Sequence, residues 1–106
     1  MQSFTLFDGD AAIQVLIDDE GFATIGVDNI DNDEILVRAI NRTFRAGAVR
    51  GTLFTGDVIH EPMARRHAMR AAKGVTYLGG KVTYLREGRL GPQFRIDWET
   101  MPFITE

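Results

Sequence analysis

The chain has 106 residues, of which 44% are hydrophobic and 25% are charged. This length and composition are typical of one globular domain, and they exclude both a disordered chain and a chain with two ordinary cores. Cysteine is absent, which excludes disulfides and every kind of cysteine-based zinc or thiol chemistry.

No apolar run approaches the ~20 residues that a membrane-spanning helix needs. The first residues, Met-Gln-Ser-Phe-Thr, contain no basic region followed by an apolar stretch, so they do not resemble a secretory signal. We therefore expect a cytoplasmic protein with no membrane partner.

Charge is distributed very unevenly along the chain. Residues 1–37 contain nine acidic side chains and no Lys or Arg, whereas residues 38–95 contain all twelve basic side chains and three acidic ones, a net charge of 12 − 3 = +9. Such a separation predicts either attraction to a polyanion or mutual attraction between two parts of the fold.

Three strands are predicted first, at residues 3–7, 11–17 and 22–27. Asp8-Gly9-Asp10 and Asp18-Asp19-Glu20-Gly21 separate them and are typical of tight turns, with glycine available for positive φ. The third segment alternates in the manner of a strand. The chain is therefore predicted to open with a β-meander.

A helix is predicted next. Asp31 suits its N-cap, Glu34 completes a capping box, and Ile30 with Ile35 occupies the two positions of a hydrophobic staple. Gly47 suits the position after its last turn. Helical spacing divides its residues into an apolar side and a basic side, and the basic side carries Arg38, Arg42 and Arg45.

A fourth strand is predicted at residues 48–55, followed by a second helix from Pro62 to about Lys73 that ends at Gly74. Its apolar side is rich in alanine and includes His67. Its polar side carries four cations, Arg65, Arg66, Arg70 and Lys73.

Gly79-Gly80 fits a two-residue turn between strands at residues 75–78 and 81–85, with Val75 opposite Tyr84 and Tyr77 opposite Val82. Residues 87–92 are predicted to form a loop, residues 93–99 a last strand, and residues 100–106 a C-terminal tail. In this arrangement Tyr77, Tyr84 and Trp98 belong to the sheet core.

The element order is therefore βββ-α-β-α-βββ. It predicts a single α+β domain over residues 1–106, with a mostly antiparallel sheet of about six strands and two helices packed on one face.

Metal or acid-base chemistry has one candidate cluster, formed by Asp57, His60, Glu61 and His67. Two histidines with carboxylates can ligate a divalent metal. The zinc-protease pattern His-Glu-x-x-His is not present, because the second histidine follows the first by seven residues and Pro62 lies between them. The alternative is that His67 is half-buried with a hydrogen-bond partner. We assign no metal, cofactor or catalytic residue.

The acidic residues 28–34 do not fit a calcium loop, since Ile30 occupies the third position and Asp33 the sixth. Their alternative role is to cap the first helix and complement its dipole. No phosphate-binding loop or nucleophile elbow is present.

The two basic helix faces are the main candidate site. If both helices cover the same side of the sheet, seven cations form one positive surface suited to phosphate or carboxylate groups: Arg38, Arg42, Arg45, Arg65, Arg66, Arg70 and Lys73. The alternative is a solvated surface, or one paired with the acidic strands.

These features predict a non-enzymatic binding or regulatory module that docks on a protein or nucleoprotein partner through its segregated charges. Opposite poles would also allow a homo-oligomer. Small accessory proteins of phages and mobile elements share this composition, which is an association and not a residue match. The alternative function is nucleic-acid binding through the two helix faces.

Overall fold

The computed structural model describes residues 1–30, 32–55, 61–88 and 91–101, with the side chains of residues 61–64 left aside. In chain order the described elements are β1 (Gln2–Asp8), β2 (Ala11–Ile17), β3 (Phe22–Asp28), α1 (Glu34–Arg45), β4 (Arg50–Thr55), α2 (Glu61–Tyr77), β5 (Lys81–Gly88) and β6 (Gly91–Asp97). The α+β class is confirmed, and the observed order is βββ-α-β-α-ββ.

The strands form one six-stranded sheet in the order β1-β2-β3-β4-β6-β5. β3 and β4 run parallel, and every other neighbouring pair is antiparallel. The sheet therefore consists of two antiparallel portions, β1-β2-β3 and β4-β6-β5, that meet at one parallel pair.

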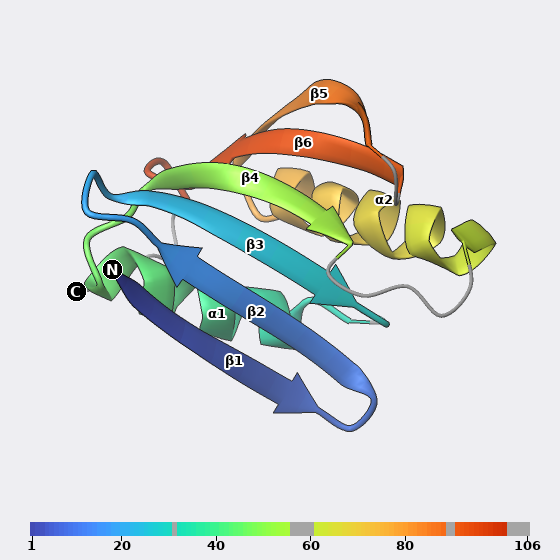
Figure 1. Ribbon diagram of the computed structural model, residues 1–106, viewed down its shortest axis with the longest axis horizontal. Helices are drawn as coiled ribbons and strands as arrows, with labels where there is room; N and C mark the ends of the chain where they lie inside the picture. Colours follow the sequence, from blue (N-terminus) through green and yellow to red (C-terminus); the bar gives the residue numbers. More distant parts are fainter. Residues whose placement is uncertain (31, 56–60, 89–90, 102–106) are drawn as a thin grey trace.

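Both helices lie on the same face of the sheet, with α1 behind β1 to β3 and α2 behind β4 and β6 in Figure 1. The strands bury alternate residues against them, such as Ile13 and Val15 in β2 and Leu53 in β4. This alternation is the period-2 pattern that a half-covered sheet requires. The predicted layering is thus confirmed, and the other face of the sheet carries no helix among the described residues.

The first two turns form as their sequences predict. Gly9 has φ +61° at the first central position of the two-residue β1–β2 turn, while Asp10 has no positive φ, and this combination is typical of a type II′ turn. Gly21 has φ +78° in the β2–β3 turn. Glycine is favoured at both positions because other residues rarely adopt positive φ.

The start of α1 differs from the prediction. The N-cap is Asp33, and Glu34 is the first helical residue. The predicted capping box, with Asp31 as N-cap and Glu34 three residues later, is therefore wrong. Asp31 itself lies outside the described residues. The Asp33 side chain makes no cap hydrogen bond and accepts one from Arg70 Nη1 at 2.8 Å. Asn32 Oδ1 instead accepts from the Glu34 N–H. The Asp33 side chain is thus used in a tertiary ion pair, and Asn32 supplies the side-chain contact at the start of the helix.

The two helices end in the same way. After α1, Gly47 N–H donates to Phe44 O and Ala48 N–H to Thr43 O. After α2, Gly79 N–H donates to Thr76 O and Gly80 N–H to Val75 O. Gly47 has φ +99° and Gly79 has φ +100°. Both ends are Schellman motifs with glycine in the left-handed position.

The strand predicted at residues 75–78 is therefore wrong, because α2 continues through Gly74 to Tyr77. Val75 is fully buried and follows Ala68, Ala71 and Ala72 at helical spacing on the packed face. Gly74 lies inside the helix, where an added Cβ would stand 2.7 Å from Leu36 Cδ1. Gly74 thus allows α1 to approach α2 and does not stop the helix.

The last hairpin is formed by β5 and β6 and not by the residues around Gly79-Gly80. The strands extend into the predicted loop, since β5 ends at Gly88 and β6 begins at Gly91. Tyr77 is 85% exposed and Tyr84 is 55% exposed, so the prediction that they belong to the core is wrong. Trp98 is fully buried as predicted, and its Nε1 donates to Ala48 O.

Met101 is buried, and the rest of the predicted C-terminal tail lies outside the described residues. Neither described helix combines the length and apolar character that a membrane-spanning helix requires.

Candidate docking surface

The three arginines of α1 lie together beside strand β1. They line a shallow groove of about 340 Å³, whose walls are Leu6 of β1 and five residues of α1, namely Val37, Arg38, Asn41, Arg42 and Arg45. We call this feature the arginine groove. Three of its six lining residues are cations and none is acidic, so the groove has a local formal charge of +3.

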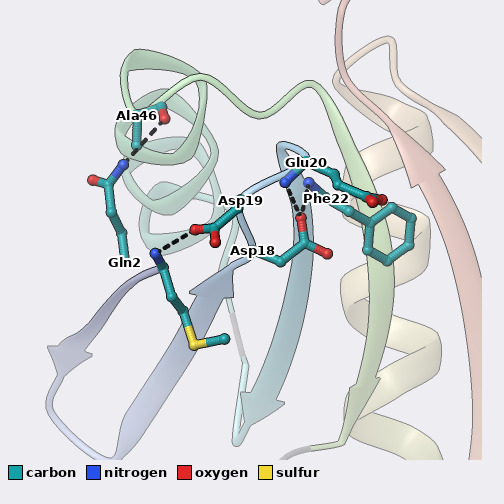
Figure 2. A network of polar contacts seen from close by, with 7 residues as sticks. Gln2, Asp18, Asp19, Glu20, Phe22 and Ala46 are labelled. Carbon is teal, nitrogen blue, oxygen red and sulfur yellow. Dashed lines mark hydrogen bonds and ion pairs between the residues drawn. The ribbon is translucent and has the colours of Figure 1, made fainter.

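The groove forms because α1 rests its apolar side on the sheet and turns its basic flank toward β1. The Arg42 guanidinium lies 4.3 Å from the centre of the Phe4 ring, a cation–π contact that holds this arginine over the strand. At the end of the helix, Gln2 Nε2 donates to Ala46 O, as Figure 2 shows. β1 is therefore held to α1 at Phe4 and to the residue that follows α1 at Gln2.

Arginine is suited to recognition at such a place. Its guanidinium is always charged and presents several N–H donors in a planar fork that matches carboxylate or phosphate geometry. Arg38, Arg42 and Arg45 are all exposed, and within the described residues Arg38 and Arg45 make no ion pair. Their charge is thus available to an external anion.

The four predicted cations of α2 have different surroundings. Arg65 forms an ion pair with Glu87 of β5, and Arg70 forms one with Asp33 at the start of α1. Arg66 and Lys73 are exposed, and no ion pair of theirs occurs in the described part of the chain. The structure brings the three α1 arginines together, whereas it uses two of the four α2 cations in internal contacts.

Two other depressions are less suited to a charged partner. One, of about 230 Å³, lies on the sheet face away from the helices and has no charged lining residue; Thr24, Gly26 and Phe54 are among its walls. The other, of about 410 Å³, lies at the β2–β3 turn and includes Asp18, Asp19 and Glu20.

Two of the three carboxylates at this turn are occupied by contacts within the protein (Figure 2). Asp18 Oδ1 accepts from the backbone N–H groups of Glu20 and Phe22, and this shapes the turn. Asp19 Oδ1 lies 2.7 Å from the amino group of Met1. Asp18 therefore belongs to the turn itself, and Asp19 to an ion pair with the residue before β1.

His67 belongs to a structural contact in the described part of the molecule. Its side chain is 12% exposed, and its Nδ1 accepts from the Asn29 N–H at 3.0 Å and lies 3.4 Å from Asp28 Oδ1. This is the half-buried, hydrogen-bonded alternative considered from the sequence. Asp57 and His60, and the side chain of Glu61, lie outside the description. Among the described residues, no three His, Cys, Asp or Glu side chains form a metal-binding group.

Sequence reasoning identified Arg38, Arg42 and Arg45 but missed the second wall of the groove. Phe4 and Leu6 occupy alternate positions of β1 and face the helices, opposite Val15 and Ile13 of β2. The alternation in residues 3–7 was a visible signal. Which helix the strand would contact could not be derived from it.

Comparison of the chain with protein-family models, with curated proteins and with solved structures gives no match.

Proposed function

We propose that this protein is a non-enzymatic binding module that holds an acidic macromolecular partner in the arginine groove. The observation that carries the proposal is the gathering of Arg38, Arg42 and Arg45 in a groove that has no acidic lining residue. Charge complementarity of this kind favours encounter with an anionic partner and disfavours a cationic one.

Carboxylate groups of a protein partner suit the groove best. The groove is short and bounded by an apolar strand, with Phe4 and Leu6 half-buried beside the cations. Apolar contacts combined with arginine contacts are typical of protein interfaces, in which arginine and aromatic residues are enriched. Contacts with nucleic-acid phosphates would need a wider basic surface, because many phosphates are neutralised together.

The proposal is tested with fluorescently labelled polyglutamate and a labelled DNA duplex of similar charge, at ~0.1 M salt, where surface charges are screened over about 10 Å. The test variant carries Arg38→Glu and Arg42→Glu. The matched control carries Arg66→Glu and Lys73→Glu, which change the formal charge equally on exposed positions of α2. Fluorescence anisotropy measures the affinity.

We expect the groove variant to lose polyglutamate affinity by about tenfold or more, which corresponds to about 1.4 kcal/mol. The α2 variant should stay within about twofold of the parent. Equal losses in the two variants would contradict a defined site. Tighter binding of the duplex, reduced most by the α2 changes, would instead support the nucleic-acid function of the helix faces.

A further inference from the structure

The two edges of the sheet differ in how they are protected against pairing with another strand. β5, at one edge, has an irregular register between Tyr84 and Arg86 and carries Lys81 and Arg86. Bulges and charged side chains are the features that prevent an edge strand from recruiting another strand. β5 is therefore a protected edge.

β1, at the other edge, has no bulge, and its one charged side chain is that of its last residue, Asp8. It pairs with β2 without interruption from Gln2 opposite Ile17 to Asp8 opposite Ala11, and it contains no Pro, Lys or Arg. No strand pairs with its outer side among the described residues. Alternate residues of such a strand direct their backbone N–H and C=O outward. β1 thus presents unpaired hydrogen-bonding groups along a regular, extended backbone.

The arginine groove lies next to this open edge. Arg42 covers the Phe4 ring and Leu6 lines the groove, and both strand residues face the helices. A strand added beyond β1 would direct every second side chain toward the same side. Those side chains would lie close to the three arginines of α1.

We propose that an extended acidic segment of a partner protein binds by adding a seventh strand to the sheet at β1. Its backbone pairs with β1, and acidic side chains on its helix-facing side pair with Arg38, Arg42 and Arg45. Backbone hydrogen bonds supply affinity in this mode, and the alternate side chains supply specificity. The inference rests on the proposed function, because it names the partner's form and the way it occupies the groove.

The charge of the groove selects a foreign segment over a second copy of this chain. Two copies paired antiparallel through β1 would bring their α1 helices side by side, with Arg38 and Arg42 of each copy close to those of the other. Like charges that approach in this way are unfavourable. An acidic strand would meet the same arginines favourably.

The experiment uses a synthetic peptide of alternating glutamate and valine, with equal numbers of each and about the length of β1, and two N-methylated derivatives of it that are isomers of each other. One isomer is N-methylated at every glutamate and the other at every valine, which leaves charge and length unchanged. In a strand, the N–H groups of alternate residues point to opposite edges. With glutamates facing the helices, only one of the two isomers lacks the N–H groups that face β1.

We expect the unmethylated peptide and one isomer to bind with similar affinity, and the other isomer to lose at least about tenfold. The isomer that fails reports whether the added strand is parallel or antiparallel. Equal affinities of the two isomers would overturn strand addition. If the Arg38→Glu, Arg42→Glu variant still binds the unmethylated peptide more weakly in that case, the proposed function stands without strand addition.

Light scattering over a range of concentrations completes the test. A monomer in the absence of peptide is expected. If the protein is instead a dimer and the unmethylated peptide dissociates it, the β1 edge binds a second copy of this chain. That result would overturn the proposal that a foreign acidic segment binds there.

Discussion

The two halves of this molecule use their charges differently. In the half that contains β4, β5, β6 and α2, cations contact acids within the protein: Arg65 pairs with Glu87, and Arg50 lies 3.7 Å from Asp97. In the half that contains β1, β2, β3 and α1, the α1 arginines gather in a groove without a carboxylate. α1 and α2 each contain three arginines, but these arginines have different roles because the residues around them differ.

The halves meet at the parallel pair β3–β4, and breaking this junction should have the largest effect. Gly51 lies opposite Ala23, where a Cβ on residue 51 would stand 2.1 Å from the Ala23 carbonyl oxygen. The clash is with backbone, which cannot move without disturbing the sheet. We expect Gly51→Ala to lower the free energy of unfolding by about 3 kcal/mol or more, measured by urea denaturation.

Gly88→Ala in edge strand β5 is the matched control. Its Cβ would meet the side-chain amide of Gln93, with Nε2 2.5 Å away, and a flexible side chain can move aside. We expect a change of less than about 1 kcal/mol. Similar losses in the two variants would show that the β3–β4 junction is no more sensitive than the edge.

His67 tests a second link between the halves, from α2 to the segment that precedes α1. Asn29 has a left-handed backbone with φ +53°, and its N–H donates to His67 Nδ1. We expect His67→Ala to cost about 1–2 kcal/mol through the lost acceptor and lost packing. His67→Asn, which keeps an acceptor near the Nδ1 position, should recover part of this loss. A fully stable alanine variant would show that His67 does not hold this segment.

The fold could be predicted where local chemistry and tertiary packing favour the same structure. The first three strands form within one residue of their predicted bounds, because their turns need glycine at Gly9 and Gly21 and their apolar residues alternate. Gly47 ends α1 as predicted for the same reason: a left-handed residue is needed there whatever lies nearby.

Prediction failed where tertiary packing decides between two local solutions. Gly74 could have ended α2, but its buried position against Leu36 keeps it in the helix. Gly79-Gly80 could have formed a hairpin turn, but it caps that longer helix. Asp31 was predicted to cap α1, but the helix begins after Asp33, whose side chain pairs with Arg70 of α2. The contacts of Gly74 with Leu36 and of Asp33 with Arg70 join residues 38 and 37 positions apart, so no local window reports them. The capping role of Gly79-Gly80 then follows from the longer helix.

The candidate site follows the same rule. Helical spacing placed Arg38, Arg42 and Arg45 on one side of α1 correctly. It could not separate them from Arg70, because the spacing of basic residues does not reveal that Asp33 lies beside that arginine. Nor could it show that the β1 edge would remain open.

The smallest expected effect is the most direct test of the contrast between the halves, because two alanine substitutions should give opposite patterns. Arg70→Ala removes the ion pair between Arg70 and Asp33, and the side chains of both residues are partly exposed. The substitution should therefore lower the free energy of unfolding by about 0.5–1 kcal/mol. Arg38→Ala removes no ion pair among the described residues, so stability should change by less than about 0.5 kcal/mol. Polyglutamate affinity should fall with Arg38→Ala and stay unchanged with Arg70→Ala.

Urea denaturation and fluorescence anisotropy on the same samples give both quantities. The crossed pattern matters more than either magnitude, because a general effect of lost positive charge would lower polyglutamate affinity in both variants alike. A stability loss confined to Arg70→Ala and an affinity loss confined to Arg38→Ala would separate an internal arginine from an external one. If both variants lost stability and polyglutamate affinity to the same extent, the two helices would share one role, and the arginine groove would have no special function.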